Sequence, residues 1–151
     1  MISAGRFQID HNQGIRLEDY QGSVGLSDLR AVASAMASDE RWSPSYHGLI
    51  DLSKADLELT ANEVLRMALT LRQDQHRSTG WMVYVVKNSA AYGQIRMLAY
   101  WARNTERTRI FLTRKEAEAW LERNADKNPP SFPEQAAANE AKTQQMLRDA
   151  V

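Results

Sequence analysis

The N-terminal part of the chain alternates between polar and apolar residues. Residues 6–10 and 15–20 change class at nearly every position, and residues 10–14 between them are turn formers. An alternation with a period of two is typical of a strand that has one covered face. We therefore predict an N-terminal β-hairpin with one solvated face, whose second strand is broken by Gly22 and Gly25.

Four later segments repeat apolar residues at a helical spacing instead. They begin near Ser27, Thr60, Ala90 and Thr113, and Ser27 is the predicted cap of the first helix. Thr60 and Thr113 are each followed three residues later by a glutamate, which is the spacing of a capping box. The predicted buried stripes of these helices are Leu29, Val32, Ala33 and Met36; Val64, Leu65, Ala68 and Leu71; Ala91, Ile95, Leu98 and Ala102; and Ala117, Trp120 and Leu121.

Short apolar runs at residues 48–52, 81–86 and 107–112 separate the helices. Residues 81–86 form the most continuously apolar run, which is typical of a strand covered on both faces. Two strands followed by alternating helices and strands predict one α/β domain over residues 1–124, with a mixed central sheet of about five strands flanked by about four helices. The residues that we expect to be fully buried in the central strands are Leu49, Ile50, Val83 and Val85.

The composition changes after residue 124. Residues 125–151 begin with a proline-containing stretch and continue as a run rich in Ala, Gln and Glu. We predict a stiff linker followed by a helical tail with a poor apolar stripe. Such a tail is weakly ordered in an isolated monomer unless it docks on another surface.

Composition and charge narrow the class of protein. The chain has 151 residues, of which 43% are hydrophobic and 25% are charged, as in an ordinary soluble domain. Nineteen Lys and Arg balance nineteen Asp and Glu, which argues against a purely electrostatic nucleic-acid binder. The absence of cysteine excludes disulfides and thiolate sites. With neither a signal sequence nor a spanning segment, we predict a cytoplasmic protein without membrane insertion.

Few residues point to catalysis. His11, His47 and His76 fall in a hairpin turn, a loop and a helix end without metal-ligand spacing, and there is no nucleophile elbow. Carboxylates between residues 51 and 58 suit acid–base work or a hard cation, but a run of alternating carboxylates on a loop is commonly solvated. Residues 22–25 lack the glycine pattern of a phosphate loop. We therefore expect neither an enzyme nor a bound metal or cofactor.

Basic residues are concentrated between residues 96 and 115, where Tyr100 and Trp101 accompany them. Aromatic rings beside arginines can stack on bases. Arginines at strand edges and helix ends more often only keep a surface soluble, and the overall charge is neutral. We therefore expect no nucleic-acid partner.

A stronger argument for a site comes from the predicted topology. The ends of parallel strands and the starts of the following helices meet at one edge of an α/β sheet, where free amides attract anions and partners. A helix cap needs no function, so a purely structural role for these residues stays open. The residues expected at that edge are Ser53, Lys54, Thr60, Lys87, Asn88, Ser89, Tyr92 and Thr113.

The sequence resembles the SpoIIAA-like group of bacterial STAS-like proteins. The resemblance rests on the order of the elements and on three segments: residues 49–55, which follow a Trp-Ser-Pro loop, residues 91–93, and residues 110–121. The resemblance covers roughly Ile9 to Leu121. It implies a mixed sheet flanked by helices, related to anti-sigma factor antagonists and more distantly to the lipid-carrying CRAL-TRIO fold.

The resemblance also implies one difference. The antagonists carry a phosphoacceptor serine at the start of the helix that follows the Asp-Leu-Ser strand, and Ala61 occupies that place in this chain. Alanine cannot be phosphorylated. Thr60 is adjacent, but its position as a helix cap already explains its hydroxyl.

These observations lead to two hypotheses of different class. The first is a non-catalytic regulatory or binding module that holds a protein partner or a small ligand at the predicted edge. The alternative is a carrier of a lipid or small apolar ligand, which requires an apolar cavity of several hundred Å³.

Self-association is the last expectation. Met97 and Trp101 lie one turn apart on a helix whose buried stripe is supplied by other residues. They are expected to form an outward apolar patch beside arginines, as at the core of an interface. We predict a homodimer through this patch, with a cover formed by the tail as the competing explanation.

Overall fold

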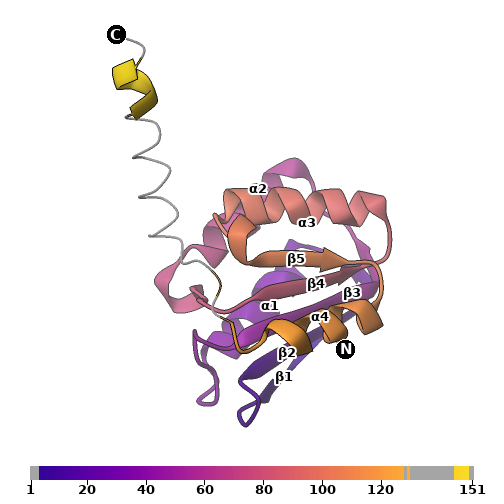
Figure 1. The fold of residues 1–151 in the computed structure, drawn as a ribbon. Coiled ribbons are helices and arrows are strands. Elements are labelled where there is room, and N and C mark those ends of the chain that lie inside the picture. Colours follow the sequence, from indigo (N-terminus) through magenta and orange to yellow (C-terminus); the bar gives the residue numbers. More distant parts are fainter. Residues whose placement is uncertain (1–3, 128, 130–144, 150–151) are drawn as a thin grey trace.

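Figure 1 shows the computed structural model, in which the predicted elements appear in the predicted order. The structure describes residues 4–127, 129 and 145–149. Residues 145–149 are helical, and the rest of the predicted linker and tail falls largely outside the described residues. The strands and helices are β1 (Gly5–Asp10), β2 (Ile15–Val24), α1 (Leu26–Ala37), β3 (His47–Leu57), α2 (Ala61–Leu71), β4 (Met82–Val86), α3 (Ser89–Trp101), β5 (Thr108–Phe111) and α4 (Arg114–Asn124), with short 3-10 helices at Asp74–His76 and Thr105–Arg107.

The five strands form one mixed sheet in the order β1-β2-β3-β4-β5. The hairpin strands β1 and β2 are antiparallel, and β2, β3, β4 and β5 are parallel to one another. The predicted mixed sheet of five strands is therefore confirmed. Because the parallel strands share one direction, all four end at the same edge of the sheet, where the helices begin.

Helices cover both faces of the sheet. One apolar cluster joins α1, α2 and α3 to one face, and a smaller cluster joins α4 to the other (Figure 1). The central strands lie between these layers, so their side chains do not reach water. The predicted burial is confirmed, with exposed fractions of 0% for Val83 and Val85, 4% for Ile50 and 5% for Leu49.

The second strand of the hairpin differs from the prediction. It continues through Gly22, whose φ of 74° is readily adopted by glycine, and ends at Val24. Its polar residues Arg16 and Glu18 are buried rather than solvated. The physical reason is that α1, α2 and α3 cover the face on which these polar residues lie.

Two helix starts also differ from their predicted positions. The first helix begins after Gly25, whose amide donates to Asp28 Oδ2 at 2.9 Å, so Ser27 is not the cap. The helix predicted from Ala90 begins at Ser89 and is capped by Asn88. The predicted Thr60 and Thr113 caps are confirmed, since both hydroxyls accept a hydrogen bond from the amide of the glutamate three residues later.

The predicted buried stripes are mostly confirmed. In α2, however, Met67 is buried and Leu65 is exposed. In α4, Trp120 is half-buried. On α3 the outward patch is confirmed, because Met97 is 44% and Trp101 46% exposed.

We expect Thr60→Ala to lower the free energy of unfolding by about 1 kcal/mol, because the variant loses the cap of α2. The Thr60 hydroxyl accepts from the Glu63 amide at 3.1 Å, and the Glu63 carboxylate accepts from the Thr60 amide at 3.0 Å. Thr60→Ser keeps the hydroxyl and is the control, with little expected change. Urea denaturation measures both. Equal stability of the alanine variant and the wild type would contradict a structural role for this hydroxyl.

Candidate functional site

The site begins with a correction to the length of the third strand. The predicted run at 48–52 is extended to His47–Leu57, so Ser53 and Lys54 lie within β3 rather than after it. Asp51 and Asp56 are likewise in the strand and not on a loop. The alternation of small or apolar residues with polar ones continues to Leu57, which is the signal for the longer strand.

An irregularity in β3 determines which side chains share a face. Asp19 of β2 pairs with Asp51, but Gln21, two residues later, pairs with Lys54, three residues later. The third strand therefore has one extra residue at this point, which is a β-bulge. The bulge returns Lys54 to the face of the sheet that Asp51 occupies, so both side chains line one pocket.

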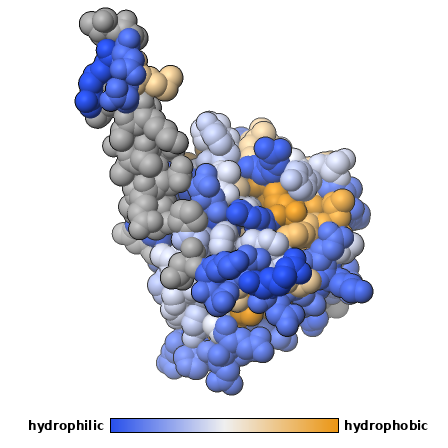
Figure 2. Space-filling view, in the orientation of Figure 1, coloured by the Kyte–Doolittle hydropathy of each residue, from blue (hydrophilic) through white to orange (hydrophobic). Residues whose placement is uncertain are grey.

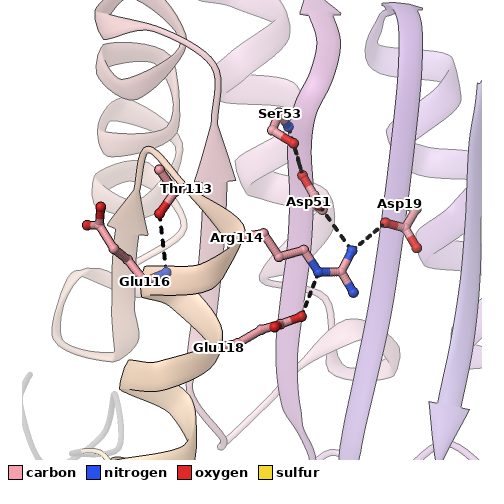
Figure 3. A network of polar contacts seen from close by, with 7 residues as sticks. All are labelled: Asp19, Asp51, Ser53, Thr113, Arg114, Glu116 and Glu118. Carbon is pink, nitrogen blue, oxygen red and sulfur yellow. Dashed lines mark hydrogen bonds and ion pairs between the residues drawn. The ribbon is translucent and has the colours of Figure 1, made fainter.

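Arg114 connects three segments of the chain at this place (Figure 3). It is the first residue of α4, and its Nη1 donates to Asp19 Oδ1 and Asp51 Oδ2, each at 3.1 Å. Its Nε donates to Glu118 Oε1 at 2.8 Å. A planar guanidinium held by three carboxylates has a fixed position and orientation.

Asp51 is ionised in this network. Burial raises its pKa, but hydrogen bonds from Ser53 and Arg114 outweigh burial and hold the pKa below its usual value. The Ser53 amide and hydroxyl donate to Asp51 Oδ1 at 2.9 and 2.6 Å. The hydrogen bond to Glu118 raises the pKa of Arg114 against the effect of burial. Asp51 and Arg114 are thus held in their charged forms.

A small polar pocket lies beside the network, over β2 and β3 and next to the start of β1. Its volume is about 80 Å³, and its charged lining comprises three cations, Arg6, Lys54 and Arg114, and two carboxylates, Asp19 and Asp51. Small-molecule and cofactor pockets usually measure about 300–1,000 Å³. This pocket has room for one side-chain group of a partner.

The other predicted edge residues lie at the starts of α2, α3 and α4, and all are exposed. Thr60 and Asn88 act as caps, and Lys87 forms an ion pair with Asp56. Ser89 and Tyr92 are on the first turns of α3, and Tyr92 is 38% exposed. The structure therefore brings the predicted residues to one edge, where Ser53, Lys54 and Thr113, the cap that precedes Arg114, adjoin the polar network.

The basic residues between 96 and 115 do not form one exposed patch. Arg107 is buried, and Arg114 belongs to the network. The guanidinium of Arg109 lies over the rings of Trp81 and Trp120, with Cζ at 5.1 and 5.5 Å from the ring centroids. Arg107 and Arg109 therefore contribute to the packing of the domain.

The described residues contain no group of three or more histidine and carboxylate side chains that could hold a metal ion. His47 is the buried first residue of β3 and not a loop residue, and its Nδ1 accepts from the Trp81 amide at 3.0 Å. Across the part of the chain that the structure describes, no helix has the length and apolar character needed to cross a membrane.

Comparison with known proteins gives a match among the solved structures. No family model matches the chain, and a search of curated proteins finds no match. The structure is similar to the crystal structure of an uncharacterised protein of the DUF3478 family from Shewanella loihica PV-4, which has a SpoIIAA-like fold. The TM-score is 0.54 with 15% sequence identity, over 80% of this chain and 96% of that chain. The chain has a SpoIIAA-like fold.

This match confirms the fold that the resemblance of residues 49–55 and 110–121 implied. The SpoIIAA-like neighbour is itself uncharacterised, and a shared fold does not imply a shared function.

Proposed function

We propose that the chain is a non-catalytic, STAS-like binding module that holds a protein partner at the edge where the parallel strands end. The observation that carries the proposal is the fixed charge network of Arg114, Asp19 and Asp51 beside a pocket of about 80 Å³. Because Ala61 takes the place of a phosphoacceptor serine, binding at this edge is not switched by phosphorylation there. The proposal places this binding in the cytoplasm, as the sequence predicts.

The charges in the pocket indicate the chemistry of the partner. Asp19 and Asp51 are both bound to Arg114. Arg6 and Lys54 are exposed in the same pocket. The lining has one more cation than carboxylates, and neither Arg6 nor Lys54 is in a described ion pair. This favours an acidic side chain of the partner, which can form charge-assisted hydrogen bonds to either cation.

The lipid-carrier alternative requires a large apolar cavity. The cavity between the sheet and helices α1, α2 and α3 has a volume of about 60 Å³. A lipid needs several hundred Å³. This cavity is too small for a lipid. A larger hollow of about 910 Å³ lies between the β1–β2 hairpin and α4, but it is open and its lining includes Asp10, Glu118 and Glu122, so it is not an enclosed apolar cavity. The two hollows therefore favour the docking module over the lipid carrier.

Charge reversal tests the proposed docking edge. The Arg6→Glu/Lys54→Glu variant should weaken the Kd for a partner captured from the source organism by about tenfold or more, because it places like charges opposite the acidic group. The control is Arg72→Glu/Arg123→Glu, which makes the same charge change on exposed residues at the C-terminal ends of α2 and α4, away from this edge. Surface plasmon resonance measures both. The same affinity for both double variants would refute docking at this edge.

The outward patch of α3 leads to a second expectation, a homodimer. Figure 2 shows apolar residues gathered over β5, between α3 and α4. Leu112 at the end of this edge strand is 59% exposed, and Met97 and Trp101 lie on the adjacent helix. An exposed edge strand with a neighbouring apolar patch is a template for pairing with a second copy.

Analytical ultracentrifugation should therefore find a dimer for the full chain and a monomer for Trp101→Glu. The alternative is that the C-terminal tail covers the apolar patch within one chain. Truncation after Pro129 distinguishes the dimer from this alternative. It retains the hydrogen bonds from the Trp81 indole to the carbonyl groups of Asn124 and Lys127. The truncated protein should remain dimeric. A monomeric full chain that starts to associate only after truncation would show that the tail covers the patch.

A further inference from the structure

The cavity beneath α1, α2 and α3 contains a buried polar network. Arg16, Glu18 and Tyr20 lie on the covered face of β2 and line this cavity. Arg16 Nη1 donates to Glu18 Oε2 at 2.6 Å, and the Tyr20 hydroxyl donates to Glu18 Oε1 at 2.7 Å. Arg16 is 5% and Glu18 8% exposed. Charged groups at this depth are uncommon unless they are paired.

The neighbouring strands leave space for these large side chains. A Cβ atom on Gly48 of β3 would lie 2.7 Å from Arg16 Cζ, and one on Gly5 of β1 would lie 2.5 Å from Tyr20 Cε1. Both distances are too short for ordinary contact. Glycine on both sides of β2 therefore allows the guanidinium and the phenol ring to lie against the sheet.

One atom of the network lacks a partner. Arg16 Nε makes no hydrogen bond, and within the described part of the chain it is the single buried side-chain nitrogen or oxygen atom without one. An unsatisfied buried donor is unfavourable, and a donor on a cation especially so. The side chain that carries it lines the cavity and is more than nine-tenths buried.

The charges around the cavity are also unbalanced. Arg107 is 5% exposed and donates to the side chain of Asn104, which lines the cavity. Burial lowers the pKa of Arg107, and so do the positive charges of Arg16 and Arg77, whereas no described carboxylate contributes. Glu18 alone offsets Arg16 in the network. Among the described side chains at this depth, Arg16 and Arg107 therefore carry one more positive charge than Glu18 offsets.

The remaining wall of the cavity is mostly apolar, and His76, Ser78 and Asn104 are polar residues in it. Half-buried Trp42, Leu71 and His76 lie at one end of it, by the C-terminal ends of α1 and α2 and away from the proposed docking edge. A volume of about 60 Å³ is room for a few water molecules or one small organic molecule. The apolar side chains of the wall include Leu29, Met36, Ile50, Met67, Met82 and Ile95.

We infer that this cavity binds a small monocarboxylate with a short apolar tail, whose carboxylate accepts a hydrogen bond from Arg16 Nε. The single negative charge balances the excess positive charge of Arg16 and Arg107, and the tail contacts the apolar wall. This site is separate from the docking edge and does not depend on the proposed function. A water molecule on Arg16 Nε is the competing occupant.

The test uses the full-length wild-type protein labelled with nitrogen-15, and follows the arginine Nε–Hε signals by NMR. Arg16→Lys removes the Arg16 signal and so identifies it. We expect butyrate to shift this signal saturably and to bind about tenfold or more tighter than butyramide, which has the same carbon skeleton without the charge. An unshifted Arg16 signal, or equal binding of the acid and the amide, would overturn the inference.

A double variant tests the site by a second route. Arg16→Met/Glu18→Met replaces both charges together by apolar side chains of similar length, which commonly preserves folding. It should lose butyrate affinity by about tenfold or more, whereas Lys54→Ala, outside the cavity, should not. Unchanged affinity of a folded double variant would also overturn the inference. If the double variant does not fold, the wild-type titration decides.

Discussion

Glu18→Met is expected to lower the free energy of unfolding by about 3–5 kcal/mol, because it removes one partner of a buried ion pair. Arg16 Nη1 and Glu18 Oε2 are 2.6 Å apart. Of the salt bridges between described residues, this is the one in which both side chains are at least nine-tenths buried. Without Glu18, the Arg16 charge stays in the core uncompensated, and the Tyr20 hydroxyl loses its acceptor. Urea denaturation measures the loss.

The double variant Arg16→Met/Glu18→Met serves as the matched control. It removes the charge that the single variant leaves behind, and should recover most of the stability. A double-mutant cycle then gives the coupling between the two residues. A single variant as stable as the wild type would show that the Arg16 side chain reaches water.

Val85→Ala is expected to lower the free energy of unfolding by about 2 kcal/mol or more, from the lost burial and the cavity left behind. Val85 has an exposed fraction of 0% and lies in β4, between β3 and β5. Leu69→Ala on α2 is the control, because Leu69 is 50% exposed and a surface change costs about 0.5 kcal/mol or less. Equal losses for the two variants would contradict the central position of β4.

The order of the elements could be predicted because its signals are local. Apolar spacing along the chain distinguishes helix from strand, and the threonine–glutamate pairs at 60 and 113 sit at true helix starts. These features need no knowledge of the rest of the fold. They also suffice for the mixed sheet, since short hairpins are antiparallel and helical crossovers join parallel strands.

The orientation of β2 could not be predicted in the same way. Alternation in residues 15–20 shows that the strand has two unlike faces, but not which of them the helices cover. The apolar residues Ile15 and Leu17 indicated that the covered face is the one that they occupy. In the structure they are half-buried under α4, on the face opposite to Arg16 and Glu18. The clue to the buried polar face is Gly5 and Gly48, whose meaning depends on the register of three strands.

The charge network was missed for a related reason. Asp19, Asp51 and Arg114 are far apart in sequence and meet only through the pairing of β2 with β3 and the position of α4. The bulge that brings Lys54 beside Asp51 has no local pattern that marks it. The edge of the sheet where the parallel strands end could be predicted from the topology. The position of the pocket on the α4 side of this edge could not, because it depends on the register of β2 against β3.

The central claim is that a partner docks at the edge where the parallel strands end. Amide hydrogen exchange of the full chain, with and without the captured partner, tests it most directly. The account predicts slower exchange in the partner complex at residues 58–61, 87–90 and 112–114, which join the strands to the helices at this edge. Slower exchange confined to the hairpin turn at residues 11–14 and to the end of α1 would contradict it.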